Sequence, residues 1–254
     1  MKIRFAALLA VLLQVPFVLA AEIKLLSTGG IRPPIEELIP QFERASGHKV
    51  SARFAGGPAV QREAEAGAPA DVVIAPSNVI EDLAKGGKVA SGTRTEIARS
   101  GVGVVVRTGM PKPDISTAEG LKRALLDAKS IAYAGDGTAG LHFEKVLDRL
   151  GIRKQVEAKA KKTAAADPKN SAPVLVERGE VDLAVSSIPT IYERKGIVFA
   201  GPLPGDLQHY ITYAGGVTAN AKDAQAARAF LRFVTAPAAA LALKAKGMEP
   251  APQR

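Results

Sequence analysis

The 254-residue sequence contains no cysteine and no tryptophan, and aromatic residues make up only 5% of it. Without cysteine the chain has no disulfide, no thiolate metal site and no attachment point for the lipid of a bacterial lipoprotein. The scarcity of aromatic rings leaves few surfaces on which nucleic-acid bases stack. The protein must therefore be held together by burial alone, for which about 230 residues are enough, and nucleic acid is not an expected partner.

Histidine is also scarce, and this bears on chemistry. The three histidines, His48, His142 and His209, have no metal-ligand spacing among them. No G-x-S-x-G nucleophile motif is present, and no pair of acids is placed for general acid–base catalysis. The sequence therefore predicts no catalytic residue, no metal site and no cofactor. We expect a binding protein rather than an enzyme.

The N-terminus has the pattern of a secretory signal peptide. Lys2 and Arg4 precede an apolar stretch from Phe5 to Val18, and Val18-Leu19-Ala20 offers small residues at the −3 and −1 positions of a cleavage site. The stretch is shorter than the roughly 20 residues of a membrane span, and no second long apolar run follows. The alternative interpretation is an uncleaved membrane anchor. We therefore interpret residues 1–20 as a signal peptide and expect a soluble periplasmic protein.

The net charge is +9, which suits the capture of small anions but is equally compatible with ordinary solubilising charge. Part of this charge lies in a lysine- and arginine-rich stretch at 153–162, which has few apolar residues. A solvated helical face explains that stretch. A docking patch for a membrane partner is the alternative.

Short apolar runs alternate with helical patterns along the chain. A strand at 23–26 is followed by a helix from Pro33, whose apolar residues Ile35, Leu38, Ile39 and Phe42 recur at helical spacing. The segment from Ala70 to Ala75 is apolar throughout, as in a strand buried on both faces. This order predicts an α/β fold with mostly parallel sheets flanked by helices.

Four expected strands end in small, hydroxyl-bearing or glycine-rich turns, and helices follow most of them. In open α/β sheets ligands bind at these strand ends, where unpaired helix amides and the helix dipole attract anions. The alternative for any single turn is an ordinary connection between a strand and a helix. The turns are Ser27-Thr28-Gly29-Gly30, Ala55-Gly56-Gly57, Asp136-Gly137-Thr138-Ala139-Gly140 and Ser186-Ser187.

The third turn also belongs to a G-x-G-x-x-G match at 135–140, which is a dinucleotide-binding pattern. That fold needs an acidic residue at the end of the next strand, about 20 positions on. The nearest candidate, Glu157, lies in the basic stretch with no strand pattern before it. A dinucleotide site is therefore disfavoured.

Longer segments carry a family resemblance: residues 22–27, 38–42, 46–50, 67–74 and 176–183, and the C-terminal segments 220–222, 230–235 and 243–247. These segments resemble the molybdate-type periplasmic solute-binding proteins of ABC transporters. The resemblance covers nearly all of the chain after the signal peptide.

The resemblance implies the two-domain, type II periplasmic binding protein fold. One domain would comprise residues 22–102 plus 215–254 and the other residues 103–214, with crossing strands near 101–104 and 211–215. A small anionic ligand would bind in the cleft between the domains. The loaded protein, expected to be a monomer, would then dock on a transporter permease in the inner membrane.

Carried over by resemblance, the ligand-binding positions fall on the four turns. Molybdate binders usually have a serine in the second loop, where this chain has Gly56 and Gly57, and a tyrosine at the position of Ser186. These departures leave two ligands open: a molybdate- or tungstate-like oxyanion, or a di- or tricarboxylate. A periplasmic enzyme or a sensor module on the same fold are alternatives from other classes. The positions are Ser27, Thr28, Gly29, Gly30, Gly56, Gly57, Thr138, Ala139, Gly140, Ser186 and Ser187.

Overall fold

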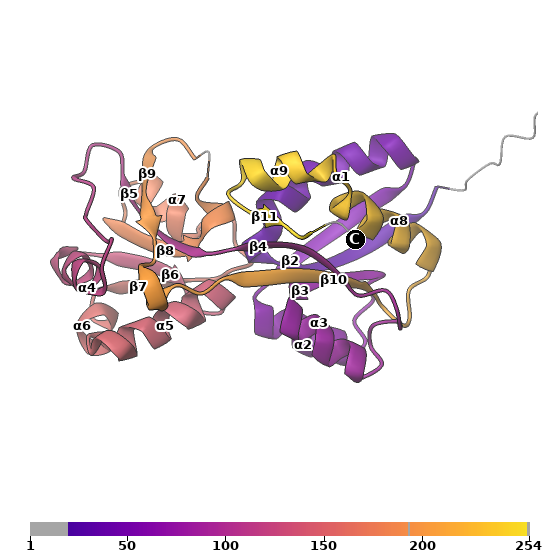
Figure 1. The fold of residues 1–254 in the computed structure, drawn as a ribbon, viewed down its shortest axis with the longest axis horizontal. Coiled ribbons are helices and arrows are strands. Elements are labelled where there is room, and N and C mark those ends of the chain that lie inside the picture. Colours follow the sequence, from indigo (N-terminus) through magenta and orange to yellow (C-terminus); the bar gives the residue numbers. More distant parts are fainter. Residues whose placement is uncertain (1–19, 193, 253–254) are drawn as a thin grey trace, which may run out of the picture.

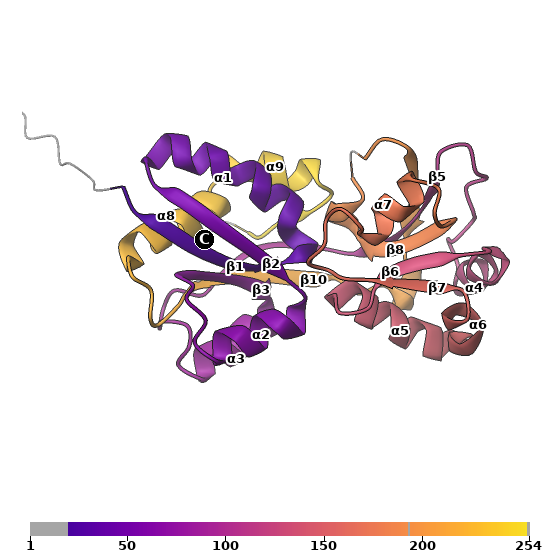
Figure 2. The same ribbon diagram turned by 180° about the vertical axis from the view of Figure 1, so that it is seen from behind.

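The computed structural model describes residues 20–192 and 194–252, and these form two lobes joined near the middle of an elongated molecule (Figure 1). Each lobe is built on one β-sheet with helices on both faces, as the reverse view also shows (Figure 2). The predicted signal peptide lies, apart from Ala20, outside the described residues. The predicted two-domain α/β fold class is confirmed.

The strands are β1 (Glu22–Thr28), β2 (Lys49–Ala55), β3 (Val72–Pro76), β4 (Thr95–Ser100), β5 (Val102–Arg107), β6 (Ile131–Ala134), β7 (Ala160–Thr163), β8 (Leu183–Ser187), β9 (Ile197–Pro202), β10 (Ile211–Val217) and β11 (Glu249–Pro250). The α-helices are α1 (Arg32–Ser46), α2 (Gly57–Glu65), α3 (Ser77–Lys85), α4 (Ala118–Asp127), α5 (Thr138–Leu150), α6 (Arg153–Glu157), α7 (Ala172–Glu177), α8 (Ala224–Thr235) and α9 (Ala239–Ala245). Three 3₁₀ turns complete the described elements: η1 (Gly29–Ile31), η2 (Ile188–Thr190) and η3 (Gly205–Leu207).

The sheet of the first lobe has the strand order β11-β4-β10-β3-β1-β2. Successive residues of a strand point to opposite faces, and here both faces are buried. Leu25 packs in one apolar cluster with α1 and α8, while Leu26 packs in a second cluster with α2 and α3. Figure 1 shows these helices on the two sides of the sheet. Strand β3, next to β1, is buried on both faces in the same way, which explains why its sequence is apolar throughout.

The sheet of the second lobe has the order β7-β6-β8-β5-β9. Its strands β6, β7 and β8 are parallel, whereas β5 pairs antiparallel with both β8 and β9. The first lobe divides in the same way, since β1, β2 and β3 are parallel and β10 is antiparallel to β3 and β4. Both sheets are thus mixed rather than mostly parallel, because strands next to the interlobe crossings run in the opposite direction.

The chain passes between the lobes at two places. The first is the short step from β4 to β5, and the second lies between β9 and β10. β10 pairs with β4 from Ile211 onward, so it belongs to the first sheet along its whole length. The domain boundaries at 102–103 and 214–215 stay a prediction.

The basic stretch at 153–162 forms helix α6 and leads into strand β7. Several of its charges are paired. Arg153 contacts Asp148, Glu144 and Glu157, and Lys162 contacts Glu144 and Glu157. This agrees with an ion-paired, largely solvated surface.

Candidate functional site

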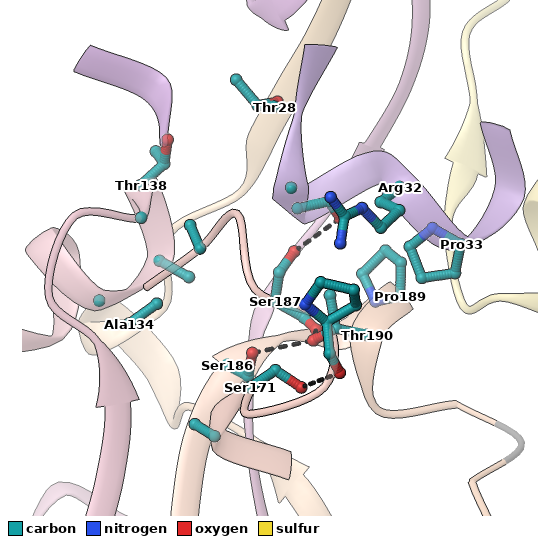
Figure 3. Close-up of a pocket in the computed structure, with 18 of the residues that line it drawn as sticks. Thr28, Arg32, Pro33, Ala134, Thr138, Ser171, Ser186, Ser187, Pro189 and Thr190 are labelled. Atoms are coloured by element: carbon teal, nitrogen blue, oxygen red, sulfur yellow. Dashed lines mark hydrogen bonds between the residues drawn. The ribbon is translucent and has the colours of Figure 1, made fainter. Parts of the chain in front are cut away.

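A cavity of about 280 Å³ lies between the two lobes. The ends of β1 and β2 and the starts of α1 and α2 line it from the first lobe. The ends of β6, β7 and β8 and the starts of α5 and α7 line it from the second lobe. Figure 3 shows that Thr28 and Arg32 from one lobe, and Thr138, Ser186 and Ser187 from the other, surround one space.

All four predicted turns meet at this cavity. Every residue predicted for the site lines it except Ser27, which is fully buried within β1 and donates to the Thr28 carbonyl oxygen at 3.5 Å. A role for the lining residues in ligand binding stays a proposal. The convergence follows from topology, because each turn follows the carboxyl end of a strand in one of two sheets that face each other.

Two helices, one from each lobe, begin at the wall of this cavity. The first amides of a helix have no intrahelical partner, and α2 and α5 begin with Gly57 and Thr138 at the cavity wall. A Cβ atom on Gly57 would lie 2.7 Å from the Thr138 hydroxyl oxygen. The positive ends of two helix dipoles therefore face one space, which favours an anionic guest.

Two glycines of the predicted site lie against backbone of the opposite lobe. A Cβ atom at Gly29 would lie 2.3 Å from the Ala165 carbonyl oxygen, and one at Gly56 would lie 2.3 Å from that of Asp136. No larger residue fits at either position without moving the lobes apart. These glycines therefore permit close approach of the lobes, a requirement that the sequence alone did not reveal.

Several charged or hydroxyl-bearing residues of the cavity were not predicted from the sequence. Arg32 and Glu36 lie two and six residues after the turn Ser27-Thr28-Gly29-Gly30. Their closeness to this predicted turn was a sequence signal that they could belong to the site. The others come from segments whose approach to the cleft depends on tertiary structure: Thr163, Ser171, Thr190, Tyr192, Arg194, Tyr213 and Lys246.

Arg32 reaches across the cleft. One of its terminal guanidinium nitrogens donates to the Ala166 carbonyl oxygen at 3.1 Å, and the guanidinium carbon lies 4.4 Å from the centre of the Phe54 ring. Its side chain is only 12% exposed. Burial lowers the pKa of Arg32 from its usual high value, against the opposing effects of Glu36 and Asp167, but a guanidinium stays charged in proteins.

Three buried polar atoms around the cavity lack a hydrogen-bond partner within the described chain: Thr28 Oγ1, Arg32 Nε and Thr163 Oγ1. Leaving such a group unpaired costs about 1–3 kcal/mol, and more when it is charged. Glu36 is 3.7 Å from Arg32 Nε, which is beyond hydrogen-bond distance. The three atoms come from both lobes, so a ligand with several acceptor groups would satisfy them together.

Tyr213 forms part of the cavity wall where β10 approaches the crossing. The residue is buried, and its hydroxyl lies 3.3 Å from the Ser187 hydroxyl, which in turn donates to the Gly30 carbonyl oxygen at 3.4 Å. Burial raises the pKa of Tyr213 to about 12, although the contact with Ser187 opposes the shift. The phenol is therefore neutral at physiological pH and available as a hydrogen-bond donor.

The charges around the cavity are unequal. Arg32, Arg194 and Lys246 contribute basic groups, whereas Glu36 contributes a carboxylate. Arg194 is paired with Glu177 at 3.1 Å and Lys246 with Glu37 at 3.4 Å. Within the described residues no group of three or more histidine, cysteine, aspartate or glutamate side chains could hold a metal ion. Basic groups thus outnumber acidic groups in the cavity wall, which favours an anionic guest.

Residues 23–249 match the family model described as bacterial extracellular solute-binding protein. The chain belongs to this family. The solute-binding protein is 28% identical to the molybdate-binding protein ModA of Azotobacter vinelandii over 90% of both chains. It also superposes on the periplasmic molybdate-binding protein structure from A. vinelandii with a TM-score of 0.72, at 20% identity, over 91% of this chain and all of the other. The predicted resemblance to molybdate-type binding proteins is confirmed.

A further relative changes the functional picture. The solute-binding protein is 32% identical to an aconitate isomerase from Pseudomonas sp., over 97% of this chain and 96% of the relative. Our prediction that the protein is not an enzyme is contradicted by this match. That prediction depended on missing histidine, cysteine and serine motifs. A proton shift within a bound substrate needs none of them, since a single carboxylate and suitably placed donors can carry it.

Proposed function

We propose that this solute-binding protein is an isomerase of a small unsaturated tricarboxylate of the aconitate type. The observation that carries the proposal is the match to aconitate isomerase over almost the full length of both chains. The cleft supports it, because buried donors from both lobes surround the same cavity. The function therefore extends the predicted binding of a di- or tricarboxylate to the conversion of that ligand.

The distribution of donors favours a tricarboxylate over a tetrahedral oxyanion. An oxyanion such as molybdate presents four oxygens around one central atom. Aconitate presents three separate carboxylates, and the cavity offers separate donor groups: the amides of α2 and α5, the guanidinium of Arg32, and the hydroxyls of Thr28 and Thr163. A guanidinium suits a carboxylate because its planar donors match the two oxygens.

The reaction itself requires a proton to move between two carbons. Aconitate has a carbon–carbon double bond next to a methylene group that carries a carboxylate. Removal of a methylene proton delocalises the electron pair over three carbons and the attached carboxylate. Return of a proton to the former vinyl carbon shifts the double bond and allows its geometry to change. Addition of a protein thiol to the double bond is excluded because the chain contains no cysteine.

Capture of a ligand for an ABC transporter is the second candidate function. It is favoured by the 28% identity to ModA and by the family, whose members bind solutes outside the cytoplasm. In that case the signal peptide predicted at 1–20 would deliver the protein to the periplasm, and a membrane permease would be its partner. The same export and periplasmic location are proposed for the isomerase.

The decisive experiment incubates the purified protein with cis-aconitate and follows the appearance of trans-aconitate by proton nuclear magnetic resonance. Calorimetric titrations of the same preparation with cis-aconitate, the saturated analogue tricarballylate, and molybdate measure binding. We expect catalytic turnover, binding of both tricarboxylates, and no heat with molybdate.

Binding of molybdate without turnover of aconitate would overturn the isomerase proposal in favour of oxyanion capture. Stoichiometric binding of tricarballylate and aconitate without turnover would instead favour tricarboxylate capture for a transporter. Thermal unfolding adds an independent readout, because a ligand at about 100 times its Kd stabilises the folded state by roughly 2.7 kcal/mol.

A further inference from the structure

The wall of the cavity includes a single carboxylate group. Among the described residues that line it, Glu36 is the one acidic side chain, and no histidine or cysteine joins it. Arginines cannot accept a proton in proteins, and Lys246 is engaged with Glu37. Glu36 is therefore the lining group whose chemistry suits removal of a proton from carbon.

The position of Glu36 relative to Arg32 strengthens this assignment. The two residues lie one turn apart on α1, and Glu36 Oε1 is 3.7 Å from Arg32 Nε. Arg32 Nε is buried and has no hydrogen-bond partner among residues 20–192 and 194–252. The methylene carbon of aconitate is bonded directly to a carboxylate carbon. A carboxylate bound by Arg32 would thus hold the methylene group one bond away, near the helix turn that carries both Arg32 and Glu36.

Tyr213 supplies a donor deeper in the same cavity. Among the described residues its hydroxyl contacts that of Ser187 at a long 3.3 Å, and the Ser187 hydroxyl donates to the Gly30 carbonyl oxygen at 3.4 Å. A carboxylate is a stronger acceptor than a serine hydroxyl. Burial in the cleft also increases the effect of a fixed donor on charge that develops during a reaction.

We propose, on the basis of the isomerase function above, that Glu36 transfers the substrate proton and that the Tyr213 hydroxyl stabilises the intermediate charge. The methylene carbon–hydrogen bond breaks, its proton goes to the Glu36 carboxylate, and its electron pair spreads over the allylic carbons and the conjugated carboxylate beside Tyr213. Glu36 then returns the proton to the former vinyl carbon. One carbon–hydrogen bond is lost and one is formed, so no oxidant, reductant or co-reactant is needed.

Two conservative variants, Glu36→Gln and Tyr213→Phe, test the two roles. Their matched controls are Glu81→Gln, which removes an exposed glutamate that also pairs one turn away on a helix, and Tyr133→Phe, which removes a buried tyrosine hydroxyl outside the cavity. The measurements are kcat and KM for cis-aconitate, the Kd for tricarballylate, and uptake of deuterium from D₂O into bound aconitate.

For Glu36→Gln we expect kcat to fall by at least about 100-fold and deuterium uptake to stop, while tricarballylate still binds. For Tyr213→Phe we expect kcat to fall by about 100-fold with little change in KM. Both controls should keep the wild-type kcat.

Wild-type turnover and deuterium uptake in Glu36→Gln would overturn its role, and an unchanged kcat in Tyr213→Phe would overturn that of the phenol. Neither result would affect the proposed function, because the wild-type protein would still be an isomerase. Absence of turnover and of deuterium uptake in the wild-type protein would instead refute the proposed function and this inference together.

Discussion

Tyr133 and Tyr213 are both fully buried tyrosines on β-strands, but their hydroxyl groups have different surroundings. The Tyr133 hydroxyl donates to Glu144 at 3.1 Å, and Glu144 also accepts from Lys162 at 2.7 Å. The Tyr213 hydroxyl has a long contact with Ser187 beside the cavity. One hydroxyl belongs to a well-paired ionic network. The other lies beside a cavity at which three buried polar atoms have no partner among the described residues.

This difference predicts which substitutions should affect folding stability and which should affect ligand binding. Around Glu144, the side chains of Tyr133, Lys162 and Arg153 all pair with its carboxylate, so a substitution there should cost folding stability and leave ligand binding intact. Around the cavity Thr28, Arg32 and Thr163 each retain an unpaired buried atom. Unpaired buried groups are costly in the free protein, so substitutions there should affect the ligand more than the fold. Each prediction below tests this separation.

The largest effect is expected for Arg32→Gln. A hydrogen bond to a charged group contributes about 1.5–3 kcal/mol, so tricarballylate should bind about tenfold to 100-fold more weakly in calorimetric titrations. Arg99→Gln is the matched control, because Arg99 also lies over an aromatic ring, that of Tyr210, but outside the cavity. Equal weakening in both variants would show that general positive charge, rather than the Arg32 contact, attracts the ligand.

Gly56→Ala should weaken binding by preventing close approach of the lobes. The added Cβ would meet the Asp136 carbonyl oxygen at 2.3 Å, which reduces the population of the binding-competent arrangement. If that population falls to about a tenth, the apparent Kd rises about tenfold. The melting temperature without ligand should hardly change. Gly86→Ala, whose Cβ would lie 3.4 Å from its nearest neighbour, is the control; matched Kd values in the two variants would contradict the closure argument.

The Glu144 network should make stability depend on acidic pH. Lys162, together with Tyr133 and Arg153, lowers the pKa of Glu144 below its usual value, despite an opposing effect of burial. The network therefore contributes stability above the pKa of the unfolded state, and this contribution is lost as the pH falls through the lower, folded-state pKa. In thermal unfolding from pH 7 downward, Glu144→Gln should lose less stability than the wild-type protein. Parallel curves for the two proteins would contradict this origin of the acid sensitivity.

The smallest effects are expected from the paired Tyr→Phe variants, which compare the two tyrosines directly. Tyr133→Phe removes a donor to a charged acceptor and should lower the free energy of unfolding by about 1.5 kcal/mol, whereas Tyr213→Phe should lower it by less than about 1 kcal/mol. Urea unfolding at pH 7 measures both values. A larger loss for Tyr213→Phe would mean that its hydroxyl serves mainly to stabilise the fold.

The sequence predicted much of the site because strand ends leave local signals. Thr28, Gly57, Thr138 and Ser186 follow or precede apolar runs that could be recognised as strands, and the topology of an α/β sheet brings such positions to one edge. Ser27 is buried within β1 and does not line the cavity, since within a strand successive side chains point to opposite faces.

Tyr213 and Thr163 gave no such signal. Tyr213 lies within a strand rather than at a strand end, and Thr163 ends a short strand next to the basic stretch. Their arrival at the cavity depends on how β10 and β7 pair with neighbours distant in the sequence. The sequence predicted no catalytic residue for a related reason: Glu36, the carboxylate proposed above as the proton acceptor, is an ordinary helix residue in the sequence, and only the structure places it at the cavity.

The sequence by itself determined the family, the α/β class and the glycine- and hydroxyl-bearing turns, because each depends on residues close together in the chain. Only the tertiary structure decided that Arg32, Glu36 and Tyr213 share one cavity, and that Gly29 and Gly56 lie against the opposite lobe. Those relationships arise between segments 80 or more residues apart. No local pattern encodes them, since they follow from the packing of two sheets against a common cleft.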